Sequence, residues 1–148
     1  MIKLKTEYKI ISLTEENIDL LEQIRFNAYG INEKKMPHTN SFYMNDLKSG
    51  NYLVIGAFIE GILVAACYTK NTYHSLYIDQ LFVLKKYQNT PSHIGSNLLK
   101  YILENHQIIE NYFQNKFYYS YLDNYRGTKK FYQNLGYNEK NNLMKRHF

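Results

Sequence analysis

The sequence predicts an α+β domain, in which a mixed, mainly antiparallel sheet of about six or seven strands is flanked by roughly four helices. Alternating or β-branched runs mark the strands, and apolar residues at helical spacing mark the helices. The elements follow the order βααβββαβαβ, so helices separate runs of strands. No repeat, low-complexity tract or linker interrupts this pattern, and residues 1–148 are therefore expected to form one domain.

The first third of the chain is expected to contain an edge strand and two helices. Residues 3–13 alternate in part and predict the strand. Thr14 is a suitable N-cap, glutamates follow it, and Gly30 can end the helix. One face of that helix carries Ile18, Leu21, Ile24, Arg25 and Ala28. After an irregular polar segment, Ser41 is expected to cap a short helix that runs through Leu47 and ends near Gly50.

Three strands joined by tight turns are expected in the middle of the chain. Residues 52–58 and 62–69 predict an antiparallel pair around a turn at Glu60 and Gly61. A polar turn at residues 71–75 leads into a central strand over residues 77–84, which is rich in aromatic and branched side chains.

A polar break and an amphipathic helix follow the central strand. Ile94, Leu98 and Ile102 recur at helical spacing, and Ser92 is the expected N-cap. Gly95 lies in the first helical turn, where free backbone N–H groups and the positive end of the helix dipole converge. This arrangement predicts an anion site, and the alternative is an ordinary connection between a strand and a helix.

The last third is expected to add a strand, a helix and a terminal strand or tight hairpin. Residues 116–122 predict the strand, and residues 137–148 are long enough for a single strand or a hairpin. Between them, a helix over residues 126–135 should end at Gly136. Its apolar face carries Thr128, Phe131, Tyr132 and Leu135.

Composition restricts the class of protein. The net charge is +5, but the cationic residues are dispersed, which does not favour a nucleic-acid partner. The lone Cys67 lies in an apolar run, so it excludes an internal disulfide and most cysteine metal sites; no metal is expected. The sequence shows no signal peptide and no apolar run of ~20 residues, which predicts a cytoplasmic protein that is not embedded in a membrane.

Two segments carry a family resemblance. Leu81-Phe82-Val83, Tyr87-Gln88 and Ile94-Gly95-Ser96, followed by Leu98-Leu99, resemble the acyl-CoA-binding segment of the GNAT superfamily of N-acetyltransferases. Downstream, residues 131–137 (FYQNLGY) are similar to the FYxxxGF segment of that family. The two segments occur in the family's order, and the resemblance covers nearly the whole chain.

The resemblance implies a binding mode for acetyl-CoA as co-substrate. In the family, the central strand and the strand after the central helix run parallel and splay apart, and the cofactor enters between them. Backbone groups of Leu81, Phe82 and Val83 would pair with the pantetheine arm. The remaining contacts implied by the resemblance, to the pyrophosphate, pantetheine and adenosine phosphate, are Gln88, Asn89, His93, Ile94, Gly95, Ser96, Asn124 and Lys129.

The loop before the central helix departs from the family pattern. His93 stands where the family has a glycine, and Gln88 lies two residues further upstream than the family's spacing places it. A two-residue expansion around Thr90 and Pro91 reconciles the spacing. His93 either offers an imidazole N–H to phosphate or is a solvent-facing loop residue.

The resemblance also implies catalytic roles. Tyr132 matches the family tyrosine that protonates the leaving thiolate, with apolar packing as the alternative. Asp79 is a candidate general base, because strand alternation predicts that it faces the same side as Leu81 and Val83. Pairing of this carboxylate with a neighbouring Lys or Tyr is the alternative.

The implied activity is transfer of an acetyl group to a primary amine by direct attack, without a covalent enzyme intermediate. Aromatic and polar residues suited to a cationic amine are Tyr29, Met36, His38, Phe42 and Tyr118. The acceptor is a small molecule or a peptide amine. Acetylation of aminoacyl-tRNA, and a non-catalytic acyl-CoA- or nucleic-acid-binding module, are the alternatives. The oligomeric state stays open between monomer and homodimer.

Overall fold

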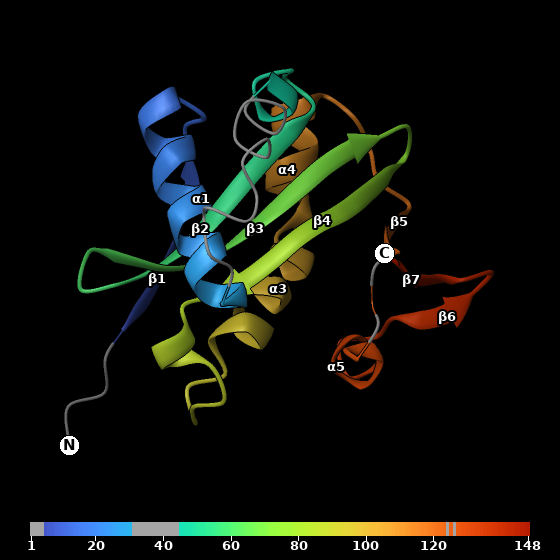
Figure 1. Ribbon diagram of the computed structural model, residues 1–148. Helices are drawn as coiled ribbons and strands as arrows, with labels where there is room; N and C mark the ends of the chain where they lie inside the picture. The colour runs from blue at the N-terminus through green and yellow to red at the C-terminus, as the bar shows by residue number, and fades with distance from the viewer. Residues whose placement is uncertain (1–4, 31–44, 124, 126) are drawn as a thin grey trace.

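A seven-stranded sheet forms the centre of the molecule in the computed structural model, which describes residues 5–30, 45–123, 125 and 127–148 (Figure 1). The strand order is β1-β2-β3-β4-β5-β7-β6, and β4 and β5 are the one parallel pair among these neighbours. The expected α+β class is confirmed, and β1 is an edge strand as predicted. The strands are β1 (Thr6–Ile11), β2 (Tyr52–Ile59), β3 (Ile62–Thr72), β4 (Ser75–Val83), β5 (Tyr119–Leu122), β6 (Asn138–Lys140) and β7 (Leu143–His147).

Helices cover both faces of the sheet. In Figure 1, α1 (Glu15–Tyr29) lies in front of the sheet, whereas α3 (Ile94–Glu104) and α4 (His106–Phe113) lie behind it. Each face has its own apolar core, with Leu21 and Phe82 on the α1 side and Leu98 and Ile102 on the α3 side. The short helix α5 (Lys129–Gln133) lies between β5 and the terminal hairpin along the chain.

Helix α1 begins and ends where the sequence predicts. The Thr14 hydroxyl accepts a hydrogen bond from the Asn17 N–H at 3.2 Å, and Gly30 ends the helix in the left-handed conformation at φ 66°. The predicted apolar face is buried. Residues 45–47 are helical, and the rest of the second predicted helix, including Ser41, lies outside the described residues.

Strands β4 and β5 stay paired only near the start of β4. The parallel register runs from Ser75 opposite Tyr119 to Tyr77 opposite Tyr121. From Ile78 to Val83, the side of β4 that faces away from β3 pairs with no strand in the described part of the chain. The sheet therefore opens at this point, as the family resemblance implied.

Two helices differ from the prediction, and the terminal segment takes one of its two predicted forms. A separate helix, α4, follows α3 after a break at Asn105, and α5 is shorter than the expected helix over residues 126–135. The terminal segment is a hairpin, because Asn141 and Asn142 both take positive φ angles (52° and 65°), as a two-residue type I′ turn requires.

Candidate active site

A cleft of about 400 Å³ lies where β4 and β5 separate. Its walls come from α1, the middle of β4, the end of β5, the loop before α5 and α5 itself. The lining residues are Arg25, Tyr29, Ile78, Asp79, Gln80, Leu81, Leu122, Asp123, Thr128 and Tyr132. The predicted residues Tyr29, Asp79, Leu81 and Tyr132, which are distant in sequence, thus line the same cleft.

Tyr132 faces the cleft from α5 and is half-buried. Its ring packs edge-on against Tyr137, with the ring centroids 5.8 Å apart. Burial raises the pKa of the Tyr132 phenol above its ordinary value of 10.0, so the hydroxyl stays protonated at neutral pH. Among the described residues, no side chain or carbonyl hydrogen-bonds this hydroxyl. Tyr132 therefore presents a proton donor to the cleft.

Asp79 lies in a β-bulge, which corrects the predicted orientation of its side chain. Gln80 pairs with Tyr68 and Ile78 with Thr69, so Asp79 is an extra residue on β4. Before the bulge Ile78 faces the α3 core, whereas after it Phe82 faces the α1 core. The Asp79 carboxylate accepts a hydrogen bond from the Tyr52 hydroxyl at 3.0 Å, on the α1 side, opposite Leu81 and Val83. Simple alternation could not reveal the bulge.

Tyr29 connects α1 to the cleft wall. Its hydroxyl lies 3.1 Å from the Gln80 side-chain carbonyl oxygen and 3.3 Å from the Leu81 carbonyl oxygen, and it can donate to either. Burial is the main cause of its raised pKa. The contact holds the end of α1 against β4, directly beside the unpaired edge of the strand.

Two further charged groups of the cleft were not identified as functional from the sequence. Asp123, at the end of β5, accepts a hydrogen bond from the Tyr77 hydroxyl at 2.6 Å. Arg25 forms a buried ion pair with Glu22, with Nε 2.6 Å from Oε2. Two features of the sequence could have indicated these residues. Arg25 lies on the predicted buried face of its helix, and Asp123 directly follows a predicted strand.

The start of α3 forms a second hollow, also of about 400 Å³. It is lined by His93, Ser96, Asn97, Lys100, Leu103, Glu104, Asn134, Leu135 and Arg146. Lys100 and Arg146 are cationic residues that the sequence analysis did not select. Because one comes from α3 and the other from β7, their proximity depends on the tertiary fold.

His93, and not Ser92, is the N-cap of α3. His93 takes the left-handed conformation (φ 48°, ψ 48°), which a glycine adopts more easily, and its side chain makes no capping hydrogen bond. A Cβ added to Gly95 would lie 3.2 Å from Val83 Cγ2, so the helix start packs closely on β4. Within the described chain, no side chain caps the first N–H groups of α3, which leaves them available to an anion.

Other predicted residues have different surroundings. Gln88 donates from its side-chain nitrogen to the Ala28 and Val83 carbonyls (2.9 and 2.7 Å), so it ties α1 to β4. Asn89 sits in the same loop with φ 56°. Lys129 forms an ion pair with Glu139 at 3.3 Å.

The remaining acceptor-site predictions are not all in the described cleft. Tyr118 precedes β5, stacks edge-on against His74 and is not among the cleft-lining residues. Phe82 is buried in the α1 core, so its backbone alone remains available to a ligand. Asn124, Met36, His38 and Phe42 lie outside the described residues.

The described residues contain no candidate metal site and no candidate membrane-spanning helix. Within the described ranges, no three histidine, cysteine, aspartate or glutamate side chains lie together in a way that could hold a metal ion. None of the described helices combines the length and apolar character that a membrane-spanning helix needs.

Comparison with solved structures shows the same fold in several acetyltransferases. The PaiA N-acetyltransferase of Thermoplasma acidophilum, in complex with coenzyme A, matches with a TM-score of 0.71 and 17% identity over 97% of this chain and 99% of that chain. The ribosomal-protein-S18-alanine N-acetyltransferase of Escherichia coli matches with a TM-score of 0.70 and 14% identity over 95% and 94%. A GNAT family acetyltransferase of Brucella melitensis, in complex with acetyl-CoA, matches with a TM-score of 0.68 and 12% identity over 97% and 88%.

The family assignment comes from the sequence. No curated protein matches the chain. The acetyltransferase (GNAT) domain family matches residues 48–139, which is more than half of the 148 residues and includes β4, α3 and α5. The chain belongs to the GNAT acetyltransferase family.

Proposed function

We propose that this protein is an N-acetyltransferase that moves the acetyl group of acetyl-CoA to a primary amine by direct attack. The observation that carries the proposal is that Tyr132 and Asp79 line one cleft, at the point where β4 loses its pairing with β5. A proton donor and a proton acceptor beside an unpaired strand edge are the groups that such a transfer needs.

The residues around this opening fit coenzyme A. The edge of β4 at Leu81–Val83, which pairs with no strand in the described chain, can take the amide groups of a pantetheine arm as an added strand would. The Leu81 and Val83 carbonyls also lie within hydrogen-bond distance of Tyr29 and Gln88, and a second lone pair on each oxygen is left for the arm. The start of α3, with its uncapped N–H groups, suits the pyrophosphate. Lys100 and Arg146 line the adjacent hollow and add the positive charge that phosphate groups require.

The chemistry assigns one proton transfer to each side chain. The neutral amine forms the new N–C bond with the thioester carbonyl carbon, and the C–S bond breaks. Tyr132, whose raised pKa keeps it protonated, donates its proton to the departing thiolate. Asp79 accepts the proton released by the amine, directly or through water. The Tyr52 hydroxyl orients the Asp79 carboxylate when it donates its one proton there and not to Asp46, which lies 3.2 Å away.

The charge of the cleft supports a cationic acceptor. The lining contains the carboxylates of Asp79 and Asp123, which accept hydrogen bonds from the Tyr52 and Tyr77 hydroxyls and can also accept from an ammonium group. Tyr29 adds an aromatic wall, which favours an ammonium group. The acceptor class is therefore a small molecule or peptide that carries a primary amine.

A thiol-release assay tests this proposal. The full chain is incubated with acetyl-CoA and a panel of small amines, aminoglycosides and peptides, beside a control without acceptor. We expect thiol release that requires one class of amine, and a product heavier by one acetyl group on nitrogen by mass spectrometry. Failure to acetylate any primary amine, with acetyl-CoA binding verified by calorimetry, contradicts the proposed activity.

A further inference from the structure

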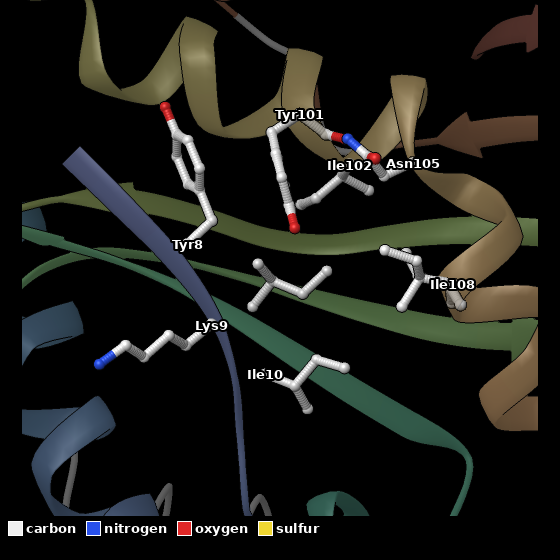
Figure 2. A pocket seen from close by; sticks show the side chains of 9 residues that line it. Tyr8, Lys9, Ile10, Tyr101, Ile102, Asn105 and Ile108 are labelled. Carbon is white, nitrogen blue, oxygen red and sulfur yellow. The ribbon is translucent and has the colours of Figure 1, made fainter.

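An apolar groove lies at the sheet edge furthest from the cleft. It has a volume of about 340 Å³ and is walled by β1, α3 and α4. Figure 2 shows the Tyr8 and Tyr101 rings side by side, with Ile10 and Ile108 further along the groove and Lys9 directed away from it. The Tyr8 and Tyr101 ring centroids are 4.5 Å apart and the rings are nearly parallel. Ile10 and Ile108 remain 47% and 46% exposed, so this apolar surface is incompletely covered.

The groove runs beside an open sheet edge. Strand β1 pairs with β2 on one side, and its other side has no strand partner among the described residues. Such an edge presents unpaired backbone donors and acceptors, which another strand can satisfy. Tyr8 and Ile10 face the groove. Lys9 borders the groove as well, but its ammonium group lies over the Phe58 ring on the α1 side, and strand alternation predicts the same side for Glu7.

We infer that a second copy of this chain docks on this edge, with the two β1 strands antiparallel about a two-fold axis at Tyr8. In this register Glu7 of each copy stands directly opposite Lys9 of the partner subunit. The side chains of both residues are more than half exposed, at 57% and 58%, and within one copy Lys9 Nζ lies 3.8 Å from Glu7 Oε2. The dimer would exchange this loose exposed pair for two pairs across the interface. Two cross-strand ion pairs of this kind favour the pairing.

The charges of β1 disfavour the neighbouring two-fold registers. An axis at Glu7 would place the two Glu7 carboxylates opposite each other, and an axis at Lys9 would do the same with two ammonium groups. Like charges directly opposite destabilise a strand pair. The Tyr8 axis also brings the two Tyr8 rings together, each already stacked on its own Tyr101, and extends the apolar groove across the interface.

Charge reversal provides a register-specific test. Sedimentation equilibrium of the full chain, over a series from ~1 to ~100 µM, is expected to show a reversible dimer. Glu7→Lys or Lys9→Glu alone should weaken the dimer by ~10-fold or more, because both cross-strand pairs become repulsive. The double variant Glu7→Lys/Lys9→Glu should restore the parental dissociation constant.

The matched control is Lys5→Glu, which changes the net charge as Lys9→Glu does. In the proposed register Lys5 stands opposite Ile11 of the partner subunit, so the dimer should persist within ~3-fold of the parental dissociation constant. Thermal unfolding verifies that each variant is folded. A parent that is monomeric throughout the series overturns the inference and leaves the groove to another occupant. A dimer that both single reversals leave intact, or that the double variant fails to restore, also overturns it.

Discussion

At the residue scale, the proposed proton donation depends on the environment of the Tyr132 hydroxyl. The ring is held by Phe131 and Tyr137, in edge-on contacts with centroid distances of 5.0 and 5.8 Å. These contacts involve the ring, and Tyr132 also lines the cleft. Packing and catalysis therefore use different parts of the same side chain, and a substitution can separate them.

Tyr132→Phe should lower turnover by ~10²–10⁴-fold, the usual contribution of a general acid. The ring is retained, so the melting temperature and the acetyl-CoA affinity should stay near the parental values. Steady-state kinetics, thermal unfolding and calorimetry measure the three quantities. Tyr121→Phe, which also removes one phenolic oxygen but lies outside the cleft lining, is the matched control and should retain activity. Parental turnover in the Tyr132 variant, with chemistry rate-limiting, would leave Tyr132 as a packing residue.

Single residues were predictable where local pattern decides their position. Tyr132 was selected through the resemblance of residues 131–137 to a family segment, and the structure brings it to the cleft. The orientation of Asp79 was wrong because a bulge adds one residue to β4 and reverses the alternation. The places of Asp123 and Arg146 beside the site depend on contacts between elements that are distant in sequence. A single sequence does not show which distant elements come into contact.

At the element scale, helix α3 connects sequence pattern to anion binding. The apolar spacing of α3 predicted its buried face correctly. The predicted N-cap, Ser92, was one residue too early, because the loop continues to His93, which takes a left-handed conformation directly before the first turn. Helix α4 was missed because the chain continues directly from α3 through Asn105. The paired asparagines of the terminal turn were the signal for the β6–β7 hairpin.

Gly95→Glu should weaken acetyl-CoA binding by ~10-fold or more, because it places a carboxylate at the helix N-terminus where the pyrophosphate is proposed to bind. The helix itself tolerates an acidic residue in its first turn, so the protein should remain folded. Gly95→Ala is the control that separates the effect of charge from the effect of size. Its Cβ would lie 3.2 Å from Val83 Cγ2, so the Val83 side chain would need to move only slightly. Calorimetry should find affinity for the alanine variant within a few-fold of the parent. Equal affinity in the glutamate variant would show that the anion binds elsewhere.

At the scale of the whole molecule, buried tyrosines couple stability to alkaline pH. Tyr68 and Tyr137 are fully buried, and burial raises the pKa of each phenol above 10.0. Below pH ~10 both states keep these protons, whereas above it the unfolded chain loses them and the folded chain retains them. The free energy of unfolding should therefore fall by about 1.4 kcal/mol per pH unit for each buried tyrosine above pH ~10. Urea unfolding at pH 8 and ~11 measures this, and equal stability at both values would contradict it.

The location of acetyl-CoA is the central claim, and amide hydrogen exchange of the full chain with and without saturating acetyl-CoA tests it most directly. We expect acetyl-CoA to protect the amides of β4 between Ile78 and Val83 and those at the start of α3, because these are the unpaired donors of the opening. The groove beside Tyr8 and Tyr101, on the far edge of the sheet, should show no change. Protection confined to that groove, or absent from both β4 and the start of α3, would contradict the account.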